Sequence, residues 1–257
     1  MKRRELVLIA ILTVLIAFMD VSGIPSVLLF NIQIIDIEPT YFSLMINFLF
    51  VGVIVFLYLK LLCPDWKLGL GKDGLSEGLK KYGAIGVFVA LAGFVGFFVG
   101  LFPFNEHPSV AKVIVEGIVY YIGVALVEEL YVRGLLLNLI EKVFIKKKNA
   151  TFFAVISSAI FFGAGHVFGM LNQPPIVIFG KAIWTACMGI FFGTVYKKTG
   201  NLWIPITFHF LINVCALPYQ FSSIKGYVDI TLYIIVPVYI ILGIYSILTL
   251  KKCGKKR

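Results

Sequence analysis

The chain has 257 residues, of which 60% are hydrophobic and only 14% are charged, and its net charge is +10. Soluble domains carry about 25% charged residues, so this composition excludes a soluble globular protein and indicates a polytopic membrane protein. One helical bundle uses the whole length, which excludes a second, soluble domain. We therefore expect a single integral-membrane domain over residues 1–257.

Eight apolar segments are each long enough to cross, or nearly cross, a bilayer, which takes about 20 residues. In chain order they are residues 5–29, 40–61, 82–102, 112–140, 150–168, 176–196, 202–218 and 228–250. The first follows Lys2, Arg3 and Arg4 but has no small-residue cleavage site, so we expect an uncleaved span and not a signal peptide. The predicted fold is an all-α bundle of about eight transmembrane helices.

Basic residues gather on one side of this arrangement. With the N-terminus in the cytoplasm, 19 of the 23 lysines and arginines fall in cytoplasmic segments. This bias follows the positive-inside rule and predicts an even number of spans with both termini cytoplasmic. The charge is thus a topology signal that favours contact with anionic membrane lipids, and we expect no nucleic-acid partner. The membrane would be the cell membrane in a prokaryote and the endoplasmic reticulum in a eukaryote.

Three charged residues lie inside the expected span 112–140: Glu128, Glu129 and Arg133. Each costs roughly 2.5–3.5 kcal/mol at the centre of a bilayer, so an ionisable residue there is a functional-site hypothesis by default. Glu129 and Arg133 are four residues apart on one helix face and can form an ion pair. Glu128 points about 100° away, so it can face a cavity and act as a general base. The competing interpretation is a purely structural ion-pair cluster.

Two other spans each supply one histidine. His166 ends the span 150–168, beside Gly163 and Gly165, where little bulk keeps another helix or a substrate away. In the span 202–218, His209 and Asn213 share one helix face. Such a pair offers donors to an oxyanion and equally offers ligands to a metal. Packing or interhelical hydrogen bonds would be the structural alternative.

Depth in the membrane sets one condition on this site. At about 1.5 Å per residue, Glu128 and His209 come near mid-membrane and His166 comes closer to the outer side. Tilt, or a break near Gly134, would have to bring them together. We expect Lys181 to reach the outer interface, and Glu116 to lie at the outer end of its span without a catalytic role.

The three patterns together resemble a known family. Glu-Glu-x-x-x-Arg begins at Glu128, Phe-x-x-x-His ends at His166, and His-x-x-x-Asn ends at Asn213, in that order on an eight-helix chain. The chain is similar to the CPBP (Abi) family of intramembrane proteases, the type II CAAX prenyl endopeptidases. By motif the resemblance covers roughly residues 110–220.

The resemblance implies hydrolysis of a peptide bond in or near the membrane. Glu128 would activate water with help from His166, His209 and Asn213 would stabilise the oxyanion, and Glu129 and Arg133 would hold the site together. The substrate would be a membrane protein or a prenylated or lipidated peptide. We expect no cofactor; the alternative is a metalloprotease with zinc on Glu128, His166 and His209.

Two other classes of function remain open from the sequence. In a proton- or cation-coupled transporter the same groups would form a relay, although no internal repeat of the kind seen in transporters is evident. In a non-catalytic membrane scaffold or immunity protein the fold would be kept without turnover. Substitution of Glu128 by glutamine distinguishes the three.

Overall fold

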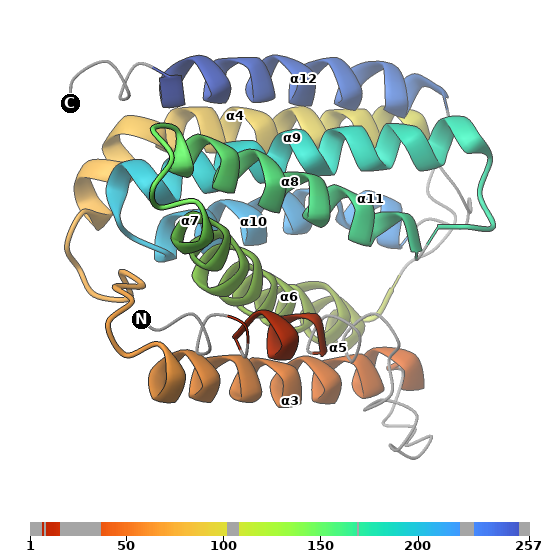
Figure 1. Ribbon diagram of the computed structural model, residues 1–257. Coiled ribbons are helices and arrows are strands. Elements are labelled where there is room, and N and C mark those ends of the chain that lie inside the picture. The colour runs from red at the N-terminus through yellow and green to blue at the C-terminus, as the bar shows by residue number, and fades with distance from the viewer. Residues whose placement is uncertain are drawn as a thin grey trace.

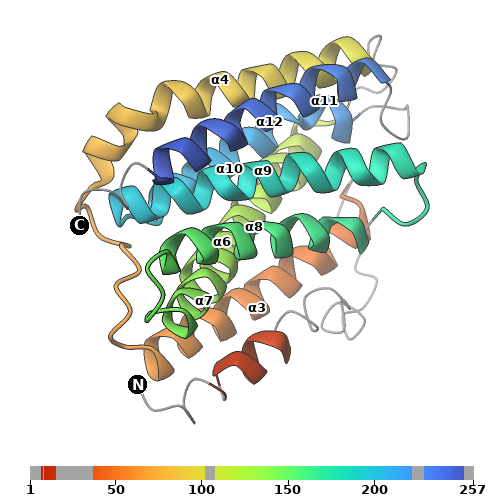
Figure 2. The same cartoon turned by 45° about the horizontal axis from the view of Figure 1, so that its top comes forward.

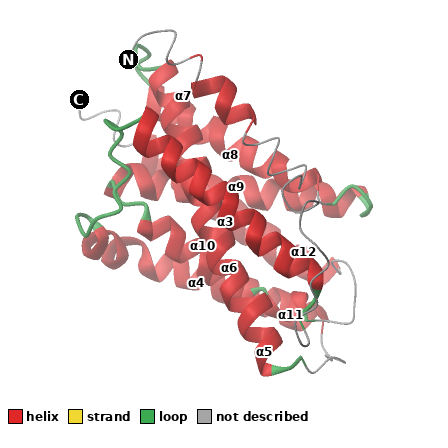
Figure 3. Ribbon diagram, turned by 90° about the horizontal axis from the view of Figure 1, so that it is seen from below, coloured by secondary structure: helices red, strands yellow, loops and turns green. Residues whose placement is uncertain are grey.

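The expected all-α membrane bundle is confirmed in a computed structural model, which describes residues 7, 9–15, 37–101, 108–168, 170–221 and 229–251. In that part of the chain, helices are joined by loops (Figures 1 and 3). Six of the described helical segments are long and apolar enough to cross a membrane. Most of the expected first span, 5–29, lies outside the described residues.

Five of the long helices are regular. They are α3 (Pro39–Leu62), α4 (Leu75–Leu101), α8 (Ala150–Phe168), α9 (Pro175–Thr199) and α12 (Asp229–Lys251). Both α3 and α9 begin with proline, whose missing N–H and fixed φ suit the first helical position. Gly200 ends α9 with a φ of 65°, the left-handed conformation that glycine adopts without strain. Helix α4 starts seven residues before the predicted start at residue 82, because its first turns are polar.

The sixth long segment, Val110–Val143, carries the glutamates and is not a uniform α-helix. It consists of α5 (Val110–Lys112), the π-helical η1 (Val113–Val119), α6 (Tyr120–Glu129), the π-helical η2 (Leu130–Leu137) and α7 (Asn138–Val143). Its 34 residues correspond to about 51 Å, well over the thickness of a bilayer core. The segment therefore runs obliquely to the other helices, as α6 does in Figure 1.

The wide turns of η2 fall where a break near Gly134 was expected. The side-chain amide of Asn138 donates to the carbonyl oxygens of Gly134 at 2.9 Å and Arg133 at 3.2 Å. These bonds occupy carbonyl groups that a π-helical turn leaves poorly aligned. The helix therefore changes its pitch directly after the two glutamates and continues to Val143.

The predicted span 202–218 is wrong as a full crossing. Helix α10 has only 13 residues (Trp203–Cys215) and is followed at Ala216 by a turn and the short α11 (Leu217–Gln220). At about 1.5 Å per residue it covers about 20 Å, less than the bilayer core. Helix α10 therefore lies among the longer helices with its C-terminal end inside the bundle (Figure 2).

Small residues set the close packing of the long helices. A Cβ on Gly189 would lie 3.0 Å from Ala159 of α8, and one on Gly193 would lie 3.1 Å from Val155. Helices α8 and α9 can therefore approach closely, as small residues at four-residue spacing allow in lipid. Helix α12 covers α4 and α9 from the other side (Figure 2). This sandwich holds α9 between the two parts of the site.

The lysine-rich helix ends meet at one end of the bundle, on the left in Figure 1. Lys197 at the end of α9 donates to Glu141 of α7 at 2.6 Å, and Lys251 at the end of α12 lies over the ring of Phe152 in α8. Helices of opposite direction thus place the basic segments together. This agrees with the arrangement from which the positive-inside bias was counted.

Candidate active site

Glu129 and Arg133 form the ion pair that their spacing predicts. Arg133 Nη1 donates to Glu129 Oε1 at 2.8 Å, and both residues are fully buried. Arg133 Nη2 also donates to the carbonyl oxygen of Gly189 in α9 at 3.3 Å. The guanidinium carbon lies 4.6 Å from the centroid of the Phe162 ring, which adds a cation–π contact. Arg133 therefore ties its own helix to α8 and α9.

His209 lies between the two glutamates. Its Nδ1 is 2.9 Å from Glu129 Oε1, and its Nε2 is 3.7 Å from Glu128 Oε2. An ionised carboxylate only accepts hydrogen bonds, so Nδ1 carries a proton and donates to Glu129. The Nε2 atom is then the reactive nitrogen of the ring. Glu128 is 22% exposed while Glu129 is fully buried, so only Glu128 can reach a substrate or water.

His166 is held in the same way by its own helix. Its Nδ1 lies 2.9 Å from the carbonyl oxygen of Phe162, which can only accept, so Nδ1 donates and Nε2 is left for other partners. The Phe162 ring is 4.7 Å from the His166 ring and 6.0 Å from the His209 ring. One aromatic side chain thus separates the two histidines, and the difference in depth expected for them does not keep them apart.

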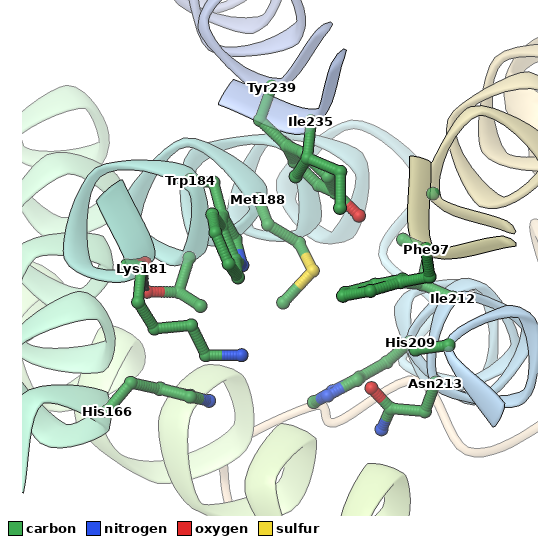
Figure 4. Close-up of a pocket in the computed structure, with 13 residues that line it drawn as sticks. Phe97, His166, Lys181, Trp184, Met188, His209, Ile212, Asn213, Ile235 and Tyr239 are labelled. Carbon is green, nitrogen blue, oxygen red and sulfur yellow. Dashed lines mark hydrogen bonds between the residues drawn. The ribbon is translucent and has the colours of Figure 1, made fainter. Parts of the chain in front are cut away.

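A cavity opens beside the histidines, with about 490 Å³ of empty space that includes its open side. Polar side chains reach it from α8 (His166), α9 (Lys181) and α10 (His209 and Asn213). Figure 4 shows His166 and Lys181 pointing into the space from one side and His209 and Asn213 from the other. The remaining lining is mainly apolar and comes from α4, α9, α10 and α12, as Phe97, Trp184, Met188, Ile212, Ile235 and Tyr239.

This corrects the expected composition of the cavity. We predicted walls from the spans 112–140, 150–168 and 202–218, but no residue of Val110–Val143 lines it, and α4, α9 and α12 do. The reason is the packing of His209, whose ring stands between the glutamates and the open space. Glu128 therefore borders the cavity through its approach to His209 Nε2.

Two other expectations change. Lys181 was expected to reach the outer interface, but its side chain lines the cavity, and its Nζ lies 4.9 Å from the ring centroid of Trp184. Sequence reasoning missed it, although Lys181, Thr185 and Met188 share one helix face and could have indicated a polar stripe on α9. Glu116 does not lie at an exposed edge: it is buried, and its Oε1 accepts from the backbone N–H of Glu38 at 2.7 Å.

The arrangement was also compared with what a zinc site requires. Zinc in proteins takes three or four ligands at about 2.0–2.3 Å around one point. Within the described ranges, no three His, Cys, Asp or Glu side chains are grouped closely enough to hold one metal ion. As they lie here, Glu128, His166 and His209 do not fit such a site, and no reaction step is derived through a metal.

Residues 110–215 match the family model of Type II CAAX prenyl endopeptidase Rce1-like proteins. The chain belongs to this family. The matched segment of this Rce1-like protein contains all three motifs, from Glu128 to Asn213. The protein is therefore a membrane-embedded hydrolase of the CAAX endopeptidase class, and the family predicted from the motifs is confirmed. Among curated proteins and solved structures nothing matches the chain.

Proposed function

We propose that the protein is an intramembrane endopeptidase in which Glu128 activates water, without a metal, against a peptide bond of a lipidated substrate. The observation that carries this proposal is the arrangement of the two histidines. Each is held through Nδ1, His209 by Glu129 and His166 by the Phe162 carbonyl, and both line one cavity that Glu128 borders. A base, two oriented imidazoles and a carboxamide are the groups that peptide hydrolysis needs.

The first step is attack by water. Glu128 accepts one proton from a water molecule while the water oxygen forms a bond to the carbonyl carbon of the substrate. The carbonyl oxygen becomes an oxyanion. The Asn213 amide and His209 Nε2–H donate hydrogen bonds to it, which stabilises the charge as it develops. For this donation His209 must be an imidazolium, and the carboxylates of Glu129 and Glu128 on either side are its counter-ions.

The second step is collapse of the tetrahedral intermediate. The C–N bond breaks, and the proton held by Glu128 passes to the leaving amine. His166 assists through Nε2, which is the ring nitrogen left for the cavity. The products are a carboxylic acid and an amine, and Glu128 returns to its ionised form. Glu129 and Arg133 do not react in this scheme: they fix His209 and join three helices.

Membrane lipids surround this site, and the substrate enters from them. Large apolar side chains are exposed on α3, α4 and α12, which suits contact with lipid. The proposed orientation places both termini in the cytoplasm. It is supported by the gathering of Lys197 and Lys251 at one end of the bundle, beside Glu141 and Phe152.

Cleavage of a farnesylated reporter peptide that ends in a CAAX sequence tests the proposal. Purified wild-type protein is compared with Glu128→Gln and His166→Ala, each with and without a strong zinc chelator. The matched control is Glu77→Gln, an exposed glutamate in the first turn of α4. Loss of cleavage by about 10²–10⁴-fold in Glu128→Gln, a marked loss in His166→Ala, and no effect of the chelator would support a glutamate-type protease.

Other results would lead elsewhere. Activity that the chelator removes and zinc restores would replace the water-activating carboxylate by a metal and make the protein a metalloprotease. An active Glu128→Gln variant would contradict the assigned base. If the wild type cleaves no lipidated peptide while Glu128→Gln changes proton or cation flux in vesicles, the transporter is supported. If neither activity is present, the scaffold is.

A further inference from the structure

Lys181 places a cationic side chain in the cavity beside the proposed catalytic groups. It lies in the second turn of α9, and its ammonium group points into the open space between His166 and His209 (Figure 4). The ring of Trp184, one turn further along the same helix, supports it at 4.9 Å. Because Trp184 is buried and packed, the lysine stem is directed inward and not along the bundle surface.

The charge of Lys181 is not neutralised by an ion pair. No carboxylate in the described part of the chain lies within 4 Å of its Nζ. Of the two nearby acids, Glu129 binds Arg133 and His209, and Glu128 approaches His209 Nε2. An ammonium group among apolar side chains in a membrane is costly unless it meets an anion. The missing anion therefore comes from outside the chain.

The surroundings define that anion further. The residues next to Lys181 on the cavity wall are Trp184, Met188 and Phe97, which suit an apolar chain and offer no further cation. A ligand that fits is therefore mostly apolar with one negative group at its end. For a peptide, this is a free C-terminal carboxylate that follows hydrophobic side chains.

We propose that Lys181 binds the C-terminal carboxylate of the peptide substrate and thereby selects chains that are cleaved close to their C-terminus. The proposal rests on the proteolytic function above and adds a residue that determines specificity. Since Lys181 shares one cavity with His166 and His209, and an extended peptide spans about 3.3 Å per residue, only a few residues fit between carboxylate and scissile bond.

The test uses two farnesylated CAAX-type peptides that differ only at the end, one with a free carboxylate and one with a carboxamide. Their binding is measured by fluorescence anisotropy to full-length protein carrying Glu128→Gln, so that no cleavage occurs. The same pair is measured after adding Lys181→Met, Lys181→Arg, or the control Lys112→Met, a lysine that does not line the cavity. Cleavage of both peptides is measured in parallel with Glu128 intact.

We expect the protein with Lys181 to bind the carboxylate peptide about 10- to 100-fold more tightly than the carboxamide, the range for hydrogen bonds to a charged group. Lys181→Met should abolish the difference by weakening carboxylate binding alone. Lys181→Arg should retain a preference, and Lys112→Met should change nothing. Thermal unfolding in detergent shows whether each variant is folded, and the arginine variant keeps the charge if the methionine variant is not.

Equal affinity for the two peptides in the presence of Lys181, or no binding of either, would overturn the assignment. So would a Lys181→Met variant that weakens both peptides equally, because a general structural or oxyanion-binding role predicts that result. Failure of this inference is separate from failure of the proposed function. A wild-type protein that cleaves both peptides at the same rate is a protease without a carboxylate site.

Discussion

The Nδ1 atom of His209 lies 2.9 Å from Oε1 of Glu129, the same oxygen that Arg133 Nη1 approaches at 2.8 Å. One carboxylate oxygen therefore fixes both the orientation of a ring in α10 and the position of a guanidinium in η2. All three residues are buried. A charged cluster of this kind is tolerated in an apolar bundle because its members satisfy one another.

Glu129→Gln should inactivate the protein without unfolding it. The amide keeps the size of the carboxylate but removes the counter-ion of Arg133 and His209, so the His209 ring loses its fixed tautomer. Loss of an orienting carboxylate beside a histidine lowers kcat by about 10²–10⁴-fold, and we expect KM to change little. Steady-state cleavage of the reporter peptide measures this. Normal kcat in Glu129→Gln would show that His209 is positioned by other contacts.

Gly189→Ala should destabilise the bundle. The added Cβ would lie 3.0 Å from Cα and Cβ of Ala159 and 3.4 Å from Arg133 Nη2, so α8 and α9 would have to separate. Overpacking of this kind costs about 1–3 kcal/mol. The matched control is Gly165→Ala, where nothing lies within 4 Å of the new Cβ and helix propensity favours alanine by up to about 1 kcal/mol.

Thermal unfolding in detergent compares these two glycine variants. We expect a lower midpoint for Gly189→Ala and an unchanged or higher one for Gly165→Ala. Because Gly189 also accepts a hydrogen bond from Arg133 through its carbonyl, activity should fall together with stability. Equal midpoints for the two variants would mean that α8 and α9 are not in the close contact described here.

Glu116→Ala should weaken the start of α3 and leave catalysis intact. The Glu116 carboxylate accepts from the backbone N–H of Glu38, the residue that precedes α3. A carboxylate at a helix N-terminus satisfies an unpaired donor and interacts with the helix dipole. Removing a capping group costs about 0.5–2 kcal/mol. Glu116→Gln keeps an acceptor and should lose less.

The readout for Glu116 is the pair of unfolding midpoint and specific activity. A lower midpoint for Glu116→Ala, with kcat per folded molecule unchanged, is the expected result. A drop in kcat at unchanged midpoint would instead place Glu116 in the chemistry, against the assignment made from its contact with Glu38.

Cys63 should resist alkylation in the folded protein. It follows the last residue of α3, is 3% exposed, and burial raises the pKa of its thiol from 9.0 to about 11. Because the folded-state pKa is raised, this contribution to stability is present below about pH 9 and is lost as the pH rises towards 11. The thiolate is the reactive form, so native labelling should stay slow up to about pH 10.

A variant with Cys187, Cys215 and Cys253 replaced by serine isolates the signal of Cys63. Iodoacetamide labelling of this variant is followed against pH, in the native state and after denaturation in SDS. Denaturation should bring the rise in rate down to about pH 9. Fast labelling of the native protein at pH 8 would contradict the burial of this thiol.

The sequence alone determined the class of the protein and the parts of its site. Composition and segment length are sufficient for an all-α membrane bundle, because apolar runs of about 20 residues have few other uses. The spacing of Glu129 and Arg133 predicted their ion pair, since one α-helical turn fixes which side chains are neighbours. The three motifs predicted the family, which the match over residues 110–215 confirms.

The tertiary structure decided how those parts meet. The sequence could not show that α10 is too short to cross, that His209 stands between Glu128 and Glu129, or that Phe162 separates the two histidines. These relations depend on the tilt of Val110–Val143 and on contacts between helices far apart in the chain. For the same reason Lys181 reads as a surface lysine in sequence and lies in the cavity in space: its direction is set by packing against Trp184, and not by its neighbours in the chain.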